Sequence, residues 1–332
     1  MISVKKKNTK QVKALLLNKK CWEGGGHYCH NIELLEEVKD GPYKIRNIIK
    51  NKGNMSFYVA FDENAPLIIA PVFVKKKIVT VAGTDEFFDY VDLFYRGDIK
   101  KERLKDAFES LMLFFSEQGA STIRWNFVPE ESISREFLLD LKCEYKQTDN
   151  TEIAFLKNED YLSRLSKSTK QNLRTAENRL KRENKTFKLL SNLCQPLPDE
   201  ILHECIDIYC ERQREKYGKG LFNQLLIKTF NYSTEMLRKQ KGVIITLMID
   251  GNVAAFMFGY INHIRKSYEV PKLAISDRFA FYSPGMILVN RSIQLFTDST
   301  DIRVLDLCRG TEQYKLKMGG KIYHTYNYTI AL

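Results

Sequence analysis

The stretch VIITLMIDGNVAAFMFGYI, residues 243–261, decides the fold class of the second half of the chain. Two apolar runs flank Asp250-Gly251-Asn252, and an Asp-Gly pair between such runs is a strong signal for a β-hairpin. The residues that follow predict, in order, a strand at 266–275, a helix at 286–296, a strand at 304–307, a short helix at 312–317 and a closing strand at 323–330.

Upstream of this hairpin the pattern predicts a helix at 160–183, a strand at 186–190 and helices at 200–217 and 222–239. The first half predicts helices at 9–19, 31–38, 102–118 and 132–141, with strands at 55–61, 67–74, 78–81, 122–127 and 151–156. We therefore expect a mixed α/β protein with two domains, residues 1–154 and 155–332.

Composition excludes several classes of protein. The 332 residues are 44% hydrophobic and carry a formal charge of +11, which suits a globular protein that binds phosphate-rich ligands or simply has a basic surface. No apolar run approaches the length of about 18 residues that a membrane span needs. The seven scattered cysteines and the absence of an export signal predict reduced thiols in the cytoplasm.

One cluster of metal-ligating residue types occurs near the N-terminus. Cys21, His27, Cys29 and His30 surround three glycines, but no second pair with matching spacing follows. Structural zinc usually needs two spaced pairs of ligands. We therefore expect no metal site.

The stretch AFYSPG, residues 280–285, joins a predicted strand to a predicted helix. A helix start carries free N–H groups and a positive partial charge, so it suits phosphate. Pro284 loses nothing in a first helical turn, and Gly285 lets a ligand approach the backbone. The alternative is an ordinary helix start capped by Ser283.

A second stretch, DLCRGTEQYK at residues 306–315, ends a strand in an acid and continues into a short helix with adjacent Tyr314 and Lys315. Asp306 facing the Tyr314 hydroxyl across a loop would form a pair suited to proton transfer. The alternative is an acid that caps the following helix while Tyr314 packs half-buried.

A third stretch, residues 164–188, holds nine positive and two negative side chains, a net charge of +7. Lys167, Lys170 and Arg174 recur at helical spacing and share a face, where they could bind an anion. The alternative is a solvated helix face. An arm that binds nucleic acid would interleave aromatic residues, and Phe187 is the only one here, so we expect no DNA partner.

Three blocks together resemble one family: LSKSTKQNLRTAENRL (165–180), YSPGMIL (282–288) and DLCRGTEQYK (306–315). Their order is similar to the GNAT acyltransferase superfamily, in particular to a double-GNAT group that includes CelD-like cellulose-biosynthesis proteins and, more remotely, Fem-type peptidyl transferases. The resemblance implies tandem GNAT-like domains, with a complete acyl-CoA-binding domain at 155–332 and a degenerate copy at 1–154.

The resemblance also implies roles for particular residues. It places the CoA pyrophosphate on Tyr282, Ser283, Pro284, Gly285 and Met286, with Arg278 nearby. Tyr314, beside Lys315, would protonate the departing thiolate, and Glu269 or Asp306 would be the base. Lys167, Lys170 and Arg174 would hold an anionic acceptor or the cofactor's phosphates. Pro271 interrupts a strand pattern, which predicts a bulge that makes room for the pantetheine arm.

The expected function is N-acyl transfer from acetyl-CoA or another acyl-CoA to an amine, without a metal. The acceptor expected by analogy is an amino sugar or another precursor of the cell envelope or a polysaccharide. One alternative is a Fem-type transferase that uses aminoacyl-tRNA and holds the RNA with the +7 segment. A further alternative is a non-catalytic binding protein that has kept the fold.

Overall fold

The protein is a mixed α/β structure of two compact units, which confirms the predicted fold class. The computed structural model describes residues 2–16, 22–24, 55–82, 89–141, 143–157, 160–217, 234–263 and 265–332. One unit comprises Met1–Asp149 and Tyr323–Leu332, and the other comprises Asn150–Ile322. Strands β8 (Glu144–Ala154) and β14 (Lys321–Ala331) contribute residues to both units.

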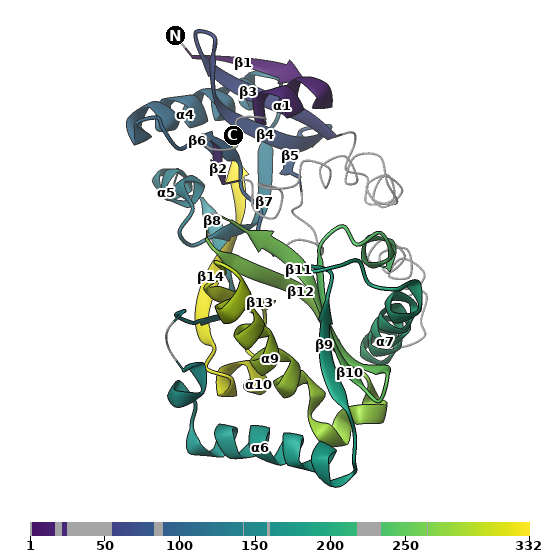
Figure 1. Ribbon diagram of the computed structural model, residues 1–332. Helices are drawn as coiled ribbons and strands as arrows, with labels where there is room; N and C mark the ends of the chain where they lie inside the picture. Colours follow the sequence, from purple (N-terminus) through teal and green to yellow (C-terminus); the bar gives the residue numbers. More distant parts are fainter. Residues whose placement is uncertain are drawn as a thin grey trace. The chain divides into compact units, whose positions relative to one another are not determined.

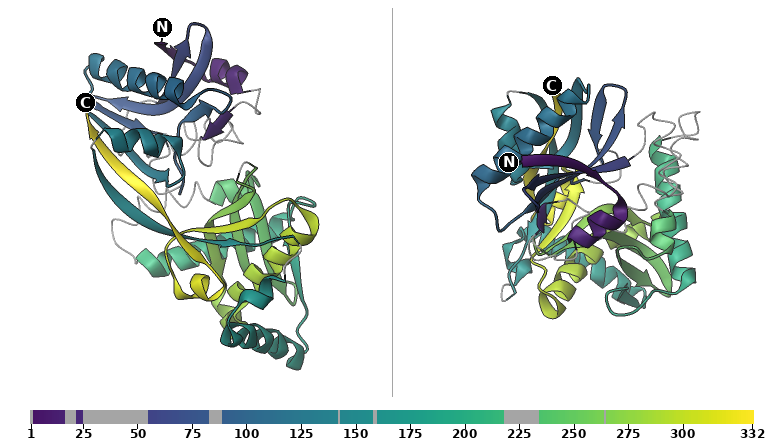
Figure 2. Two further views of the ribbon diagram at one scale, coloured as in Figure 1. Left: turned by 90° about the vertical axis from the view of Figure 1, so that its left-hand side faces the viewer. Right: turned by 90° about the horizontal axis from the view of Figure 1, so that it is seen from above.

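The first unit is a sheet covered by helices (Figure 1). Its strands run in the spatial order β1 (Ile2–Lys7), β3 (Met55–Asp62), β4 (Ala65–Lys75), β5 (Ile78–Val81), β7 (Thr122–Pro129), β14 and β8. The short strands β2 (Trp22–Gly24) and β6 (Phe94–Arg96) pair beside β4, and the helices are α1 (Thr9–Leu16), α4 (Lys101–Glu117) and α5 (Ile133–Asp140). β14, drawn in yellow, pairs antiparallel with β7 (Figure 2).

The second unit contains a six-stranded arrangement in the order β8, β13 (Val304–Arg309), β12 (Ser267–Ile275), β11 (Asn252–Asn262), β10 (Val243–Ile249) and β9 (Phe187–Ser191). Neighbouring strands are antiparallel except β12 and β13, which are parallel. The helices are η3 (Tyr161–Arg164), α6 (Lys167–Arg182), α7 (Asp199–Tyr217), η4 (Asp277–Tyr282), α9 (Pro284–Ser299) and α10 (Gln313–Lys317).

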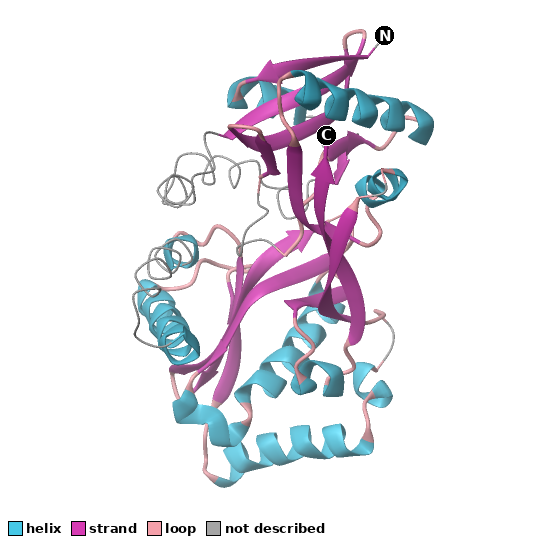
Figure 3. Ribbon diagram, turned by 180° about the vertical axis from the view of Figure 1, so that it is seen from behind, coloured by secondary structure: helices cyan, strands magenta, loops and turns pink. Residues whose placement is uncertain are grey.

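Helices cover both faces of this second sheet. α7 packs on β11 and β12 from one face, while α9 packs on β9–β12 from the other (Figures 1 and 3). This explains why residues 253–259 of β11 are all buried. A strand with a helix on each face reads as a continuous apolar run instead of an alternating one. α6 lies outside this layer, against α9 and η4.

Several predicted elements differ from the observed ones. The helix expected at 160–183 is interrupted, because the Ser166 hydroxyl caps α6 by accepting a hydrogen bond from the Thr169 N–H at 3.1 Å. β8 begins at Glu144, and most of its first residues are exposed, so no apolar pattern marks them. Lysine-rich β1 was not predicted. Tyr323–Leu332 group with the first unit, although the pattern assigned them to the second half.

Other expectations fall outside the described residues. These are the helix at 31–38, most of the helix at 222–239 and the cluster of Cys21, His27, Cys29 and His30. In the remainder of the chain, no three His, Cys, Asp or Glu side chains come together as a metal site would require. No helix in that remainder combines the length and the apolar character needed to cross a membrane.

The bulge predicted at Pro271 is confirmed. Between β11 and β12 the register shifts, so that Tyr260 faces Glu269 and Phe258 faces Lys272, which leaves β12 with one more residue than β11. Gly259 lies opposite the bulge, and a Cβ atom added to it would stand 1.9 Å from the Glu269 carbonyl oxygen. Only glycine allows the two backbones to approach this closely.

Replacement Gly259→Ala is expected to destabilise the second unit by about 1–3 kcal/mol, because backbone must move to make room for one methyl group. Gly285→Ala is the matched control, since its Cβ would meet only a Ile275 methyl at an ordinary 3.4 Å. The free energy of unfolding of each variant, measured by denaturant titration, tests this. Equal stability of the two variants would contradict it.

Candidate functional site

The two parallel strands β12 and β13 separate soon after they meet. They pair only over Ser267 with Val304, Tyr268 with Leu305, and Glu269 with Asp306. Beyond this point the strands no longer pair with one another, so their facing edges present backbone groups that no longer bond across the gap. The gap therefore begins immediately after two acidic residues.

Those two acids belong to a cluster of charged side chains in the second unit. Glu152, Asp306 and Glu269 lie in one row across β8, β13 and β12, because Asp306 is the register partner of both glutamates. Arg265 contacts all three: it is 2.9 Å from Glu152, 3.2 Å from Asp306 and 3.6 Å from Glu269. The Glu269 and Asp306 side chains are only 1% and 0% exposed.

Additional hydrogen bonds fix the orientation of the buried carboxylates. Glu269 Oε1 accepts from the Asn262 side-chain amide at 3.0 Å and from the Ser267 hydroxyl at 3.1 Å. Asp306 Oδ1 accepts from the Cys308 N–H at 2.8 Å, while Oδ2 faces Arg265. Each acid thus has a defined rotamer at the point where the strands separate.

The charges of this cluster do not balance if every acid is ionised. Three carboxylates would surround one guanidinium, a net charge of −2 largely removed from water, which favours retention of a proton. Burial raises the pKa of Asp306 to about 7, although Arg265 opposes the shift. A carboxyl group with this pKa exchanges a proton near neutral pH.

A loop follows β13 and is held by Lys315. The Lys315 ammonium donates to the carbonyl oxygens of Leu307 at 2.9 Å, Arg309 at 2.7 Å and Gly310 at 3.4 Å, and lies 2.9 Å from the Glu312 carboxylate. The ammonium is thereby engaged by the loop itself. In this structure Lys315 holds the end of β13, whereas the sequence grouped it with catalytic residues.

Strained backbone accompanies this loop. Cys308 has φ of 54° and is buried, at the point where the register between β13 and β8 shifts. A positive φ costs free energy for a non-glycine residue, and such strain persists only where the surroundings hold it. The Lys315 bonds, and the Thr151 hydroxyl that donates to the Gly310 carbonyl at 2.7 Å, supply that restraint.

Tyr314 lies on α10, directly after this loop. Its side chain is half-buried, and burial raises the pKa of its phenol above the usual value, with Glu312 adding to the shift. A phenol in this environment stays protonated through the neutral range. It is therefore available as a proton donor rather than as a base.

The start of α9 has fewer free N–H groups than the sequence suggests, and Ser283 does not cap it. Ser283 adopts a left-handed conformation, with φ of 50°, and its side chain does not cap the helix. Both the Met286 and Ile287 N–H groups donate to the Ser283 carbonyl, at 3.1 and 3.4 Å. Since Pro284 has no N–H, Gly285 supplies the one N–H of this turn without a partner among the described residues.

Other side chains predicted here have partners. The buried Tyr282 donates its hydroxyl to Glu183 on α6. The Arg278 guanidinium donates to the side chain of Asn252, the first residue of β11, at 3.1 Å. Arg179, which was not predicted as a site residue, donates to the Phe281 carbonyl at 2.7 Å and stacks on its exposed ring at 4.4 Å.

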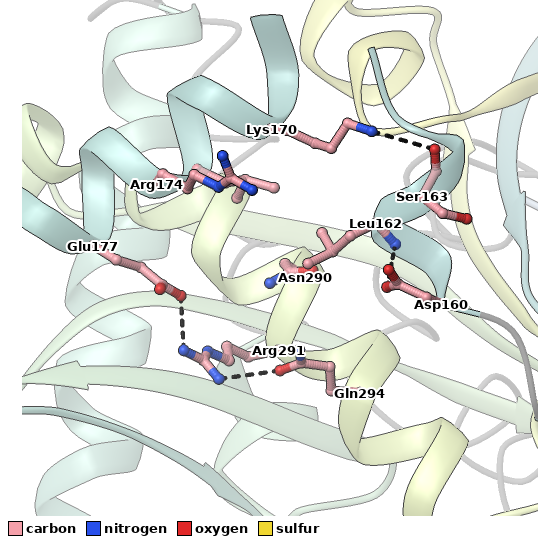
Figure 4. A pocket seen from close by; sticks show the side chains of 10 residues that line it. Asp160, Leu162, Ser163, Lys170, Arg174, Glu177, Asn290, Arg291 and Gln294 are labelled. Carbon is pink, nitrogen blue, oxygen red and sulfur yellow. Dashed lines mark hydrogen bonds and ion pairs between the residues drawn. The ribbon is translucent and has the colours of Figure 1, made fainter. Parts of the chain in front are cut away.

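The predicted cations of α6 lie elsewhere. Lys170 and Arg174 line a pocket of about 450 Å³ that α6, η3 and α9 enclose (Figure 4). No member of the charged cluster (Arg265, Glu152, Glu269 and Asp306) lines this pocket. Lys167 is exposed at the start of α6 and does not line this pocket. The structure thus places the predicted cations of α6 apart from the charged cluster around Arg265.

Comparison with known proteins identifies the fold. Residues 167–316 match the family described as "Acetyltransferase (GNAT) domain". This part of the chain is therefore similar to GNAT acetyltransferase domains. No curated protein sequence matches the chain.

Solved structures with the same fold cover nearly the whole chain. They include L-PGS from Bacillus licheniformis (TM-score 0.56, 13% identity, 98% of this chain and 93% of that chain). A tandem GNAT protein from the clavulanic acid biosynthesis pathway has TM-score 0.52 and 8% identity (100% and 98%). FemX has TM-score 0.51 and 9% identity (99% and 97%). At such identities the likeness shows the fold alone, and it confirms the predicted tandem GNAT architecture.

Sequence reasoning missed two members of the charged cluster in the second unit. Glu152 lies in the predicted strand at 151–156, and Arg265 lies between two predicted strands. The available signal was a charged residue within an apolar strand pattern, which costs free energy unless a partner is near. The pairing of β8 with β13, which brings Glu152 to Asp306, joins distant parts of the sequence.

The raised pKa of Asp306 predicts how stability depends on pH. The native state binds the Asp306 proton more tightly than the unfolded state, so this stabilisation is present at low pH and is lost as pH rises through about 7. In Asp306→Asn this loss should be absent. Relative to the variant, the wild type should therefore lose about 3 kcal/mol between about pH 5 and about pH 8. Parallel pH profiles of unfolding free energy would contradict the assignment.

Proposed function

We propose that the GNAT domain transfers an acyl group from acyl-CoA, with acetyl-CoA as the first donor to test, to a primary amine. The observation that carries the proposal is the separation of β12 and β13 immediately after Glu269 and Asp306. An extended ligand that enters this gap brings its reactive end to a buried carboxylate whose pKa lies near neutrality. Proximity to such a base is what aminolysis of a thioester requires.

The donor's pantetheine arm suits the walls of the gap. It is long and narrow and carries amide groups, which can bond to the backbone edges of β12 and β13 as an added strand would. The bulge at Pro271 widens the entrance on the β12 side. The pyrophosphate is assigned to the start of α9, where the helix dipole and the Gly285 N–H favour an anion.

The acceptor is assigned as an amine that arrives protonated. The carboxylates around Arg265 outnumber the positive charge, so the cluster attracts a cation. The ammonium group gives one proton to ionised Asp306, and the neutral nitrogen then attacks the thioester carbonyl. Glu269 remains the alternative base, because it lies beside Asp306 in the same register. An amino sugar or a related envelope precursor is the acceptor class that the family resemblance favours.

Collapse of the tetrahedral intermediate completes the reaction. The new C–N bond is kept, the C–S bond breaks, and the phenol of Tyr314 supplies the proton to the departing sulfur. The resulting phenolate takes up the second proton of the nitrogen, which leaves a neutral amide. Lys315 contributes indirectly, because its bonds to three carbonyl groups hold the end of β13 and the loop that leads to Tyr314.

A second candidate, an aminoacyl-tRNA-dependent transferase, draws support from one observation. The first turn of α9 offers a single N–H, from Gly285, without a partner among the described residues, where GNAT loops with several glycines offer more. A donor that relies less on a pyrophosphate cradle would suit this turn. The exposed cations of α6 would then meet RNA phosphates, in a manner that added salt would weaken.

Ligand-induced stabilisation separates these candidates. We expect acetyl-CoA or a longer acyl-CoA at micromolar concentration to raise the melting temperature of the full chain, because a ligand that binds only the native state stabilises it. Uncharged and aminoacylated tRNA provide the comparison, in buffers of two salt concentrations. Stabilisation by aminoacyl-tRNA without any response to CoA thioesters would overturn the proposal in favour of the second candidate.

Replacement Tyr314→Phe should lower kcat roughly 100-fold and leave KM for the acyl-CoA nearly unchanged, because only proton donation to sulfur is lost. Tyr145→Phe, an exposed tyrosine in the first unit, is the matched control. Donors with a better thiolate leaving group should restore part of the rate of the Tyr314 variant. Unchanged turnover in that variant would remove Tyr314 from the chemistry.

A further inference from the structure

A second pocket lies away from the strand gap, between α6 and the outer side of α9 (Figure 4). Its volume of about 450 Å³ is in the range of small-molecule sites. η3 and the first half of α6 form one wall, and the middle of α9 forms the other. The lining residues are Asp160, Leu162, Ser163, Lys170, Leu173, Arg174, Glu177, Asn290, Arg291 and Gln294.

Asn290 lines this pocket with an amide that is almost entirely removed from solvent. The residue is 4% exposed, and its side-chain oxygen has no hydrogen-bond partner within the described part of the chain. The Nε of the next residue, Arg291, is likewise buried without a partner there. Buried polar groups in native proteins are nearly always bonded. This oxygen has almost no accessible area, so a bound molecule that donates a hydrogen bond satisfies Asn290 once the amide turns toward the pocket.

The three cations of the pocket differ in the hydrogen bonds and ion pairs that they make with other side chains and with the backbone. Arg291 is held by Glu177 at 2.7 Å and by Gln294 at 3.1 Å. Among the described residues, the Lys170 ammonium donates only to the Ser163 carbonyl oxygen, at 3.3 Å. Arg174 has no ion pair or hydrogen bond to any of the described residues. Lys170 and Arg174 stand one helical turn apart on α6 and therefore share a face.

The charge of the lining favours an anion. Lys170, Arg174 and Arg291 stand against Asp160 and Glu177, an excess of one positive charge. Asp160 is already used, since its carboxylate accepts from the Leu162 N–H at 3.0 Å. An arginine fork beside a lysine point charge suits a phosphate group, which offers several acceptor oxygens. Leu162 and Leu173 leave room for a short apolar segment.

We propose that this pocket binds a small phosphate ester. The phosphate meets Arg174 and Lys170, and a hydroxyl group of the same molecule donates to the Asn290 side-chain oxygen. The site is separate from the gap between β12 and β13, because no residue of the charged cluster around Arg265 lines it. Its occupation is therefore measured by binding alone, without an acyl donor, and does not depend on the acyl-transfer proposal.

Isothermal titration of the full chain with sn-glycerol 3-phosphate tests the proposal, with inorganic phosphate and glycerol as partial ligands. Glycerol 3-phosphate should bind more tightly than phosphate, and glycerol should not bind. Arg174→Gln should weaken binding by about tenfold or more, through the loss of charge-assisted hydrogen bonds. Lys181→Gln removes the same charge from an exposed position on α6 outside the pocket and should bind normally.

Asn290→Leu distinguishes a ligand site from a structural residue. Leucine has a similar size and removes the buried oxygen, so the unliganded variant should melt at the same temperature as the wild type or higher, yet bind glycerol 3-phosphate more weakly. A lower melting temperature without ligand would show that Asn290 serves the fold and would overturn its role in binding. Equal affinities of Arg174→Gln and Lys181→Gln, or no binding of any phosphate, would overturn the pocket.

Discussion

The separation of β12 from β13 depends on distortions in both strands, and the rest of the candidate site depends on that separation. β12 carries the bulge at Pro271, which is possible because Gly259 has no Cβ atom; an added Cβ would stand 1.9 Å from the Glu269 carbonyl oxygen. β13 carries the left-handed Cys308, which Lys315 restrains through three carbonyl groups. A regular parallel pair would close the gap by continuing the hydrogen-bond ladder.

The buried charges follow from the same geometry. Adjacent strands place register partners side by side on one face, so acids at matched positions of β8, β13 and β12 must share one environment. One arginine cannot neutralise three acids, and burial makes the remaining charge costly. The protein tolerates this cost in free energy at the point where the strands separate. The same burial raises the pKa of Asp306 there to about 7.

Sequence patterns identified elements where local physics decides them. β10 and β5 match their predicted ranges, because apolar runs bounded by turns leave little choice. The first residues of β8 were missed, since they are mostly exposed and carry no apolar pattern. Asp306 was found as an acid near the end of an apolar strand and Glu269 through the family resemblance. Glu152 and Arg265 gained meaning only from pairing between distant segments. The role of Lys315 likewise depends on carbonyl groups whose direction no sequence pattern reveals.

The family likeness supports a thioester donor in the strand gap, whereas the start of α9 offers little to bind its phosphates. The likeness of residues 167–316 to GNAT acetyltransferase domains supports the proposal that a thioester lies in the gap between β12 and β13. The first turn of α9 offers few free N–H groups to a phosphate, because Pro284 lacks an N–H and the Ser283 carbonyl accepts from the N–H groups of Met286 and Ile287. A donor held there must depend chiefly on backbone edges along the gap and on the helix dipole. Binding would then rest on the length and amide content of the arm more than on its phosphates, which is a property of the pantetheine chain itself.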